Sequence, residues 1–124
     1  MKNEVKISNF AGLIKNNNGY HYDGDLKIDG DLIVDVDELV VDGDLVVAGN
    51  LTAAGNVSAD NIEVAGDLIA RDIVKSYGNA TIGGTIRAKL LCAENVTAQN
   101  IVGRLAINGN INVGKIYAPL ANIF

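Results

Sequence analysis

The sequence predicts a single-domain, all-β protein whose chain forms a three-sided parallel β-helix, a solenoid of about five to six coils. Three observations predict this fold class: a six-residue repeat, aliphatic residues spaced two positions apart, and many glycines followed by Asp or Asn. The 124 residues are enough for one hydrophobic core. The 14 Gly and single Pro indicate many tight turns between short strands.

The repeat has the form Gly, then Asp or Asn, then an aliphatic residue, any residue, and a second aliphatic residue or Ala. Clear copies are GDLKID, GDLIVD, GDLVVA, GNLTAA, GNVSAD, GDLIAR and GNINVG. Weaker copies lie between them, with one-residue insertions or deletions near positions 36–39 and 73–80. A unit this short predicts a solenoid, because it can bury its aliphatic side chains only by stacking against other copies.

Each unit predicts a strand of three or four residues, because side chains two positions apart lie on the same face of an extended chain. Three units per coil would stack equivalent residues 15 to 19 positions apart on one face. The expected stack is Leu26, Leu45, Ile62, Ala80, Val96 and Ile111. We expect one continuous core that includes Leu45, Leu51, Val57, Ile62 and Leu68.

The polar residues just before these aliphatic residues predict two ladders along the edges of the solenoid. One ladder is Asp25, Asp44, Asn61, Asn79, Asn95 and Asn110, and the other is Asp31, Asn50, Asp67 and Thr85. Asn side-chain amides can hydrogen-bond along such a stack. An Asn between two Asp also lowers the repulsion between carboxylates. These residues therefore have a structural explanation that needs no binding site.

The chain divides into three expected segments: an N-terminal tail or capping segment at 1–22, repeats at 23–118, and a C-terminal cap or end-contact segment at 119–124. The N-terminus has no apolar stretch of signal-peptide length, and no segment reaches the roughly 20 apolar residues that span a bilayer. We therefore expect a cytoplasmic protein. Phe10, Ala11, Leu13 and Ile14 either cover the first coil, which we favour, or dock on a membrane.

The repeats at 23–118 resemble those of bactofilins, the polymer-forming cytoskeletal proteins of bacteria. The resemblance implies a right-handed β-helix that assembles end to end into filaments, without nucleotide or metal, in some cases held at a membrane by the N-terminal tail. Two features depart from the family pattern. The early coils are rich in Asp, and the N-terminal segment is not an obvious membrane anchor.

The ends of the solenoid are the expected contact sites, because they expose unpaired strand edges that must be capped or used for assembly. The candidate residues for self-association are Phe10, Leu13, Ile14, Ile116, Tyr117, Leu120, Ile123 and Phe124. The expected partner is a second copy of the chain. The function that we predict is therefore a self-assembling structural scaffold.

Charge is distributed unevenly along the chain. Residues 1–22 contain three Lys and one Glu, residues 23–72 contain thirteen acidic and two basic residues, and residues 73–124 contain five basic residues and one Glu, for net charges of +2, −11 and +4. An acidic first half could attract a protein partner, so a fibre or binding module and an acidic decoy that imitates nucleic acid are alternative functions. We do not expect the protein to bind nucleic acid.

No motif indicates an enzyme, a metal site or another cofactor. The single histidine, His21, lies before the regular repeats with no recognisable nucleophile or orienting carboxylate beside it. The acidic positions 29, 31, 35, 37 and 42 lack an EF-hand loop or calcium-binding nonapeptide. TIGGT at 81–85 lacks the Lys-Ser/Thr of a phosphate-binding loop. Cys92 has no partner for a disulfide, and we expect a small buried thiol.

Overall fold

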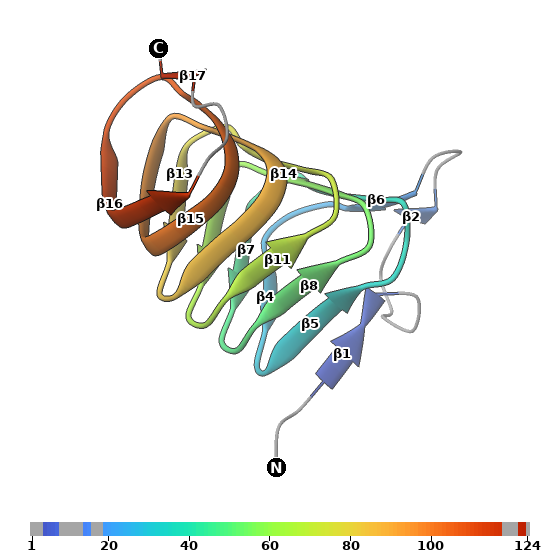
Figure 1. Cartoon of the computed structure of the whole chain (residues 1–124). Coiled ribbons are helices and arrows are strands. Elements are labelled where there is room, and N and C mark those ends of the chain that lie inside the picture. Colours follow the sequence, from blue (N-terminus) through green and yellow to red (C-terminus); the bar gives the residue numbers. More distant parts are fainter. Residues whose placement is uncertain (1–3, 8–13, 16–18, 118–121, 124) are drawn as a thin grey trace.

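In the computed structural model, the chain forms a parallel β-solenoid of about 6 turns (Figure 1). The structure describes residues 4–7, 14–15, 19–117 and 122–123. The described parts near the two termini lie at opposite ends of the stack of coils (Figure 1). The three-sided parallel β-helix predicted from the repeat is confirmed.

Three columns of strands form the three faces. The first face contains β4 (Leu26–Ile28), β7 (Asp44–Val47), β10 (Asn61–Val64), β13 (Asn79–Ile82), the start of β15 (Asn95–Ile107) and the start of β16 (Ile111–Tyr117). The second face contains β1 (Glu4–Lys6), β5 (Asp31–Val34), β8 (Leu51–Ala53), β11 (Leu68–Ala70), the start of β14 (Thr85–Ala93), the middle of β15 and the end of β16. The third face contains β3 (Tyr20–Tyr22), β6 (Glu38–Val41), β9 (Asn56–Ala59), β12 (Ile73–Ser76) and the ends of β14 and β15. The short strands β2 (Ile14–Lys15) and β17 (Asn122–Ile123) pair with β3 and with the end of β15.

The pairing register matches the predicted stack on the first face. Leu26 pairs with Leu45, Leu45 with Ile62, Ile62 with Ala80, Ala80 with Val96, and Val96 with Ile111, all in parallel. The second face stacks Leu32, Leu51, Leu68, Ile86 and Ile101 in the same way. The repeat therefore fixes which residues are neighbours across coils, because each unit places its aliphatic pair at the same point of the turn.

One hydrophobic core runs through the solenoid. The five residues predicted to lie in it, Leu45, Leu51, Val57, Ile62 and Leu68, are each at most 1% exposed. The coils shorten toward the C-terminus, since the paired residues on the first face are 19 positions apart at Leu26 and 15 apart at Val96. Small side chains such as Ala80, Ala88 and Ala98 point inward there, which keeps the narrower interior densely packed.

One of these shorter turns has a local irregularity. Between Arg87 and Leu90 of β14 the register with β15 shifts, so that two residues lie opposite the single Gly103. Gly103 has a φ of +134°, and a Cβ at this position would overlap the backbone carbonyl oxygen of Ala88. This position therefore requires glycine.

The parallel ladder begins before Asp23. β1 pairs with β5, matching Val5 with Leu32, and Ile7 immediately after β1 is completely buried. β3 pairs with β6 on the third face. Ile14 in β2 is 54% exposed. Within the described ranges, no helix is long and apolar enough to span a bilayer.

Candidate functional site

The acidic residues of the early coils lie mainly at the edges of the solenoid, where they support the stacking of coils. The first edge precedes the strands of the first face, and the second edge precedes those of the second face. Asp25 Oδ1 accepts a hydrogen bond from the backbone N–H of Asp44, at 2.8 Å. On the second edge, Asp31 Oδ1 accepts from Asn50 N–H and Asn50 Oδ1 accepts from Asp67 N–H, both at 2.8 Å. The predicted ladders are therefore present, but at these rungs the donor is the backbone and not a neighbouring amide.

The glycine of each Gly-Asp or Gly-Asn pair makes room for this bond. Gly66 precedes the donor Asp67, and a Cβ on Gly66 would overlap Oδ1 of Asn50 in the preceding coil. Gly84 has the same relation to Asp67. The Asx side chain of one coil thus occupies the space beside the glycine of the next coil, so the two residue types of the repeat depend on each other.

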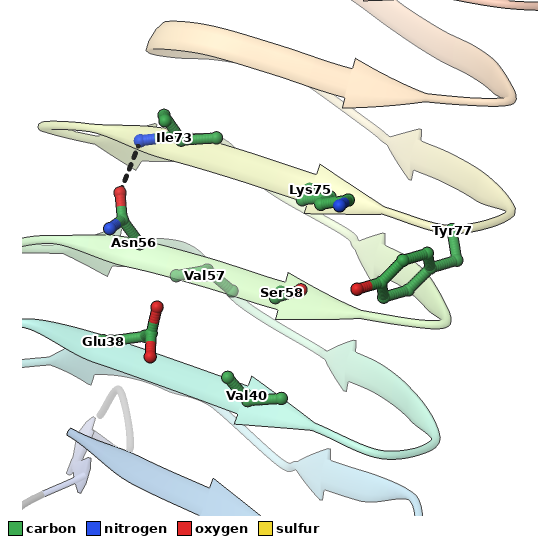
Figure 2. A pocket seen from close by; sticks show the side chains of 8 residues that line it. All are labelled: Glu38, Val40, Asn56, Val57, Ser58, Ile73, Lys75 and Tyr77. Atoms are coloured by element: carbon green, nitrogen blue, oxygen red, sulfur yellow. Dashed lines mark hydrogen bonds between the residues drawn. The ribbon is translucent and has the colours of Figure 1, made fainter. Parts of the chain in front are cut away.

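A different bond forms where a larger residue replaces this glycine. Asn61 follows Asp60, and its Nδ2 donates to Asp44 Oδ1 at 2.9 Å. Asn95 follows Glu94, and its Nδ2 donates to Asn79 Oδ1 at 2.9 Å. The amide-to-amide ladder predicted from the sequence is confirmed at this second pair. The third edge precedes the strands of the third face. There, Ile73 N–H donates to Asn56 Oδ1 at 3.0 Å although the residue before the donor is Asp72 and not a glycine (Figure 2).

The expectation that no orienting carboxylate lies near His21 is wrong. His21 Nε2 donates a hydrogen bond to Asp42 Oδ2 at 2.5 Å, and both side chains are partly exposed. The two residues are 21 positions apart in sequence, but β3 pairs with β6, so they lie one coil apart. Neither residue lines the hollows described below. The pair therefore joins the start of the chain to the next coil.

No metal site is built from the acidic edges in the described part of the chain. No group of three or more His, Cys, Asp or Glu side chains lies close enough to hold an ion. Asp31, one of the acidic positions considered for calcium, is instead an acceptor for a backbone N–H. The carboxylate density of the early coils thus reflects the stacking of separate edges, not convergence on one point.

Two shallow hollows lie on either side of Tyr77 on the third face. One, of about 320 Å³, is lined by Glu38, Val40, Asn56, Val57, Ser58, Ile73, Lys75 and Tyr77 (Figure 2). The other, of about 340 Å³, is lined by Lys75, Ser76, Tyr77, Cys92, Ala93, Glu94, Ala106 and Asn108. The Tyr77 ring is 64% exposed and lies 4.8 Å from Lys75 Nζ. Tyr77 was not among the residues singled out from the sequence, although it occupies a corner position where other coils carry Asp42 and Asn108.

Cys92 is only partly buried, so the prediction of a buried thiol is wrong. It occupies an outward position of β14, between the inward-facing Leu91 and Ala93. Cys92 is a free cysteine.

The residues predicted for self-association fall in several places. Ile116 and Tyr117 are the last residues of β16, Ile123 lies in β17, and Ile14 lies in β2. Phe10, Leu13, Leu120 and Phe124 lie outside the described residues. β16 and β17 both pair with β15, so they belong to the last layer of the solenoid.

The last coil has an unpaired edge in the part of the chain that the structure describes. β16 pairs only with β15, on one side. Val96 N–H donates to Asn110 C=O at 3.0 Å. In the alternating pattern of a parallel ladder, Asn110 and Asn112 therefore face the preceding coil, and the backbone groups of Ile111 and Val113 point toward the position of a further coil. At the other end of the solenoid, β7 is the only described strand that pairs with β4.

Comparison of the chain with protein-family models, with curated proteins and with solved structures found no match.

Proposed function

We propose that this protein is a non-enzymatic structural scaffold that assembles end to end through the strand edges of its first and last coils. The single observation that carries the proposal is the unpaired outer edge of β16 among the described residues. Such an edge presents N–H and C=O groups at the spacing of a parallel ladder, so another coil end can pair with it. The bactofilin resemblance independently implies assembly of this kind.

The arrangement of polar groups supports a structural role over a catalytic one. The edge carboxylates that would otherwise be candidates for acid or base chemistry, such as Asp31 and Asp67, accept hydrogen bonds from the backbone of the next coil. The His21–Asp42 pair lies outside both hollows on the third face. These side chains therefore contribute to the stack that would be repeated in a filament.

A proline scan of β16 tests the proposal. Val113→Pro should abolish filaments while the solenoid stays folded, because the substitution removes an N–H that points away from the protein. Filament formation is measured by negative-stain microscopy and light scattering, and folding by circular dichroism. Val113 is partly buried against the core, so Val113→Ala controls for lost packing. Asn112→Ser controls for a side-chain change on the same strand that leaves the outer edge intact.

Two results would contradict end-to-end assembly. One is a wild-type protein that stays monomeric at high concentration in both low and high salt. The other is a Val113→Pro protein that forms the same filaments as the wild type. The first result would favour a second candidate function, a binding module that uses the exposed Tyr77 and the hollows beside it. The second result would mean that the filaments form through a surface other than the outer edge of β16.

A further inference from the structure

The outward row of the second face carries three large aliphatic side chains. The row has one residue per coil and consists of Lys6, Ile33, Thr52, Ile69, Arg87, Val102 and Tyr117. Ile69, at its centre, is 43% exposed. The corresponding rows are Lys27, Val46, Glu63, Thr81, Thr97 and Asn112 on the first face, and His21, Val40, Ser58, Lys75, Cys92 and Ala106 on the third face. Only the second face carries large aliphatic side chains near both ends and at the centre of its row.

Charge changes sign along the third edge, which borders this face. The early coils place Asp37 and Glu38 there, and the late coils place Lys89 and Arg104. Near the middle, Arg71 and Asp72 lie side by side in the chain. The structure gives Asp37, Lys89 and Arg104 no ion-pair partner among the residues it describes. The third edge therefore carries charges of both signs that a partner could pair with, if the partner's charges run from basic to acidic where this edge runs from acidic to basic.

We propose that the second face is the interface of an antiparallel dimer, in which a second copy lies face to face with the first and its solenoid axis is reversed. A two-fold axis along β11 places Ile69 against Ile69 of the second copy. The same axis places Ile33 against Val102, Thr52 against Arg87, and Asp37 near Arg104 of the other copy. A second copy is the occupant that fits, because reversal of the chain itself supplies the complementary order of charge.

The opposite orientation is disfavoured by the same charges. If both axes pointed the same way, the acidic early coils of the two copies would lie together, and the third edge of one copy would meet the second edge of the other, which would bring Asp37 near Asp31. Like charges placed together across an interface select against that arrangement. The apolar row thus supplies the contact, and the charged edge selects its direction.

The face is small, so the dimer is weak. At about 4.8 Å per coil, six coils extend about 29 Å, and a strand with its corners is about 15 Å wide. Both copies together would bury about 900 Å², which is below the roughly 1,000 Å² expected of a stable interface and is in the range of weak, transient contacts. This contact does not depend on end-to-end assembly, because it uses a side of the solenoid and not its ends.

Disulfide trapping tests the geometry directly. In a Cys92→Ser background, Ile69→Cys should form a disulfide-linked dimer in high yield on mild oxidation, since this residue meets itself at the two-fold axis. Thr52→Cys alone should cross-link poorly. A mixture of Thr52→Cys and Arg87→Cys proteins should give the mixed dimer. These side chains point outward, so all three variants should keep the wild-type circular dichroism spectrum.

Charge reversal provides a second measurement, by sedimentation equilibrium at low salt. Arg104→Glu and Asp37→Lys should each weaken the dimer about tenfold, and the double variant should recover to within about threefold of the wild type. Equal self-cross-linking of Ile69→Cys and Thr52→Cys would overturn the antiparallel arrangement. A protein that shows no cross-linking at Ile69→Cys would overturn the interface and leave the row free for a different partner.

Discussion

At the scale of single residues, this fold depends on a contact between coils and not on a contact within one strand. The Asx side chain at the edge of one coil accepts a hydrogen bond from the backbone of the next, and the glycine of that next coil leaves space for it. Asn50 and Gly66 form such a pair on the second edge. Each Gly-Asx dipeptide of the repeat therefore contacts two neighbouring coils: its glycine leaves space for the Asx side chain of the preceding coil, and its own Asx side chain accepts a hydrogen bond from the following coil.

The Asn50–Gly66 pair gives a prediction for stability. Gly66→Ala should lower the free energy of unfolding by about 1–3 kcal/mol, because the added Cβ displaces the Asn50 amide oxygen and leaves the Asp67 N–H without its acceptor. The measurement is denaturant unfolding followed by circular dichroism. Asn50→Ala removes the same hydrogen bond from the other side. The double variant should therefore lose less free energy of unfolding than the sum of the losses in the two single variants.

Full additivity of the two substitutions would contradict the coupling. Ala54→Ser provides a control, since Ala54 is an exposed corner residue. Its effect on the free energy of unfolding should stay within about 0.5 kcal/mol.

At the scale of strands, β1 shows that the N-terminal segment contributes to the stack. It adds a parallel strand to β5 and places Ile7 in a completely buried position. The region before Asp23 was expected to be a tail or a cap, and residues 4–7 cover part of the first coil. Burial of Ile7 indicates that this strand contributes to the stability of that coil.

Ile7→Ala tests the contribution of this segment. Loss of a fully buried Ile side chain should lower the free energy of unfolding by about 2–4 kcal/mol, through lost burial and the cavity that remains. The neighbouring Lys6 is exposed, so Lys6→Ala should change stability by less than about 0.5 kcal/mol. Thermal and urea unfolding of the two variants give the comparison. Similar stability of the two would mean that the segment does not pack on the solenoid in solution.

The strands that could be predicted are those marked by the Gly-Asx motif. The motif repeats at the first and second edges, so the stack from Leu26 to Ile111 could be aligned by sequence alone. The contact between His21 and Asp42 was missed, because His21 lies before the first Gly-Asx motif. Without a motif, the sequence does not show which later residues lie one coil away from His21. β1 carries a detectable signal in the two-residue spacing of Val5 and Ile7, but a single pair does not indicate its partner strand.

The candidate sites were harder to predict, for a physical reason. Inward residues follow a strict pattern because the core must be filled in every coil. Outward residues face solvent and are free to vary, so the apolar row through Ile69 becomes visible only when the coils are stacked. The exposed Tyr77 and the partly buried Cys92 were missed for the same reason.

At the scale of the whole molecule, sequence position becomes position along the axis, so the charge asymmetry of the chain becomes an asymmetry of the rod. The segment 23–72 carries a net charge of −11, and the segment 73–124 carries +4. Any contact between copies is therefore sensitive to their relative direction. The side-by-side antiparallel dimer and a head-to-tail filament both bring opposite charges together, whereas contacts between like ends do not.

Salt dependence separates the two kinds of end contact. Head-to-tail stacking places the acidic first coil of one copy on the basic last coil of the next, and added salt should shorten such filaments by screening the attraction. Contacts between like ends, which the bactofilin resemblance implies, should keep or increase filament length as salt is raised, because salt screens repulsion between equal charges and favours apolar burial. We expect the second result. Filament length is measured by negative-stain microscopy at low and high salt.

This test requires a protein that cannot form the lateral dimer, since salt also weakens that contact. Ile69→Lys places a charge at the centre of the second face, far from the end strands β4 and β16, so it should block the lateral contact and leave the strand edges unchanged. Filaments of Ile69→Lys that lengthen or persist in high salt would support contacts between like ends. Filaments of the same variant that dissolve as salt is raised would contradict this expectation. They would show that the acidic end of one copy stacks on the basic end of the next, so that the charge asymmetry of the rod sets the direction of assembly.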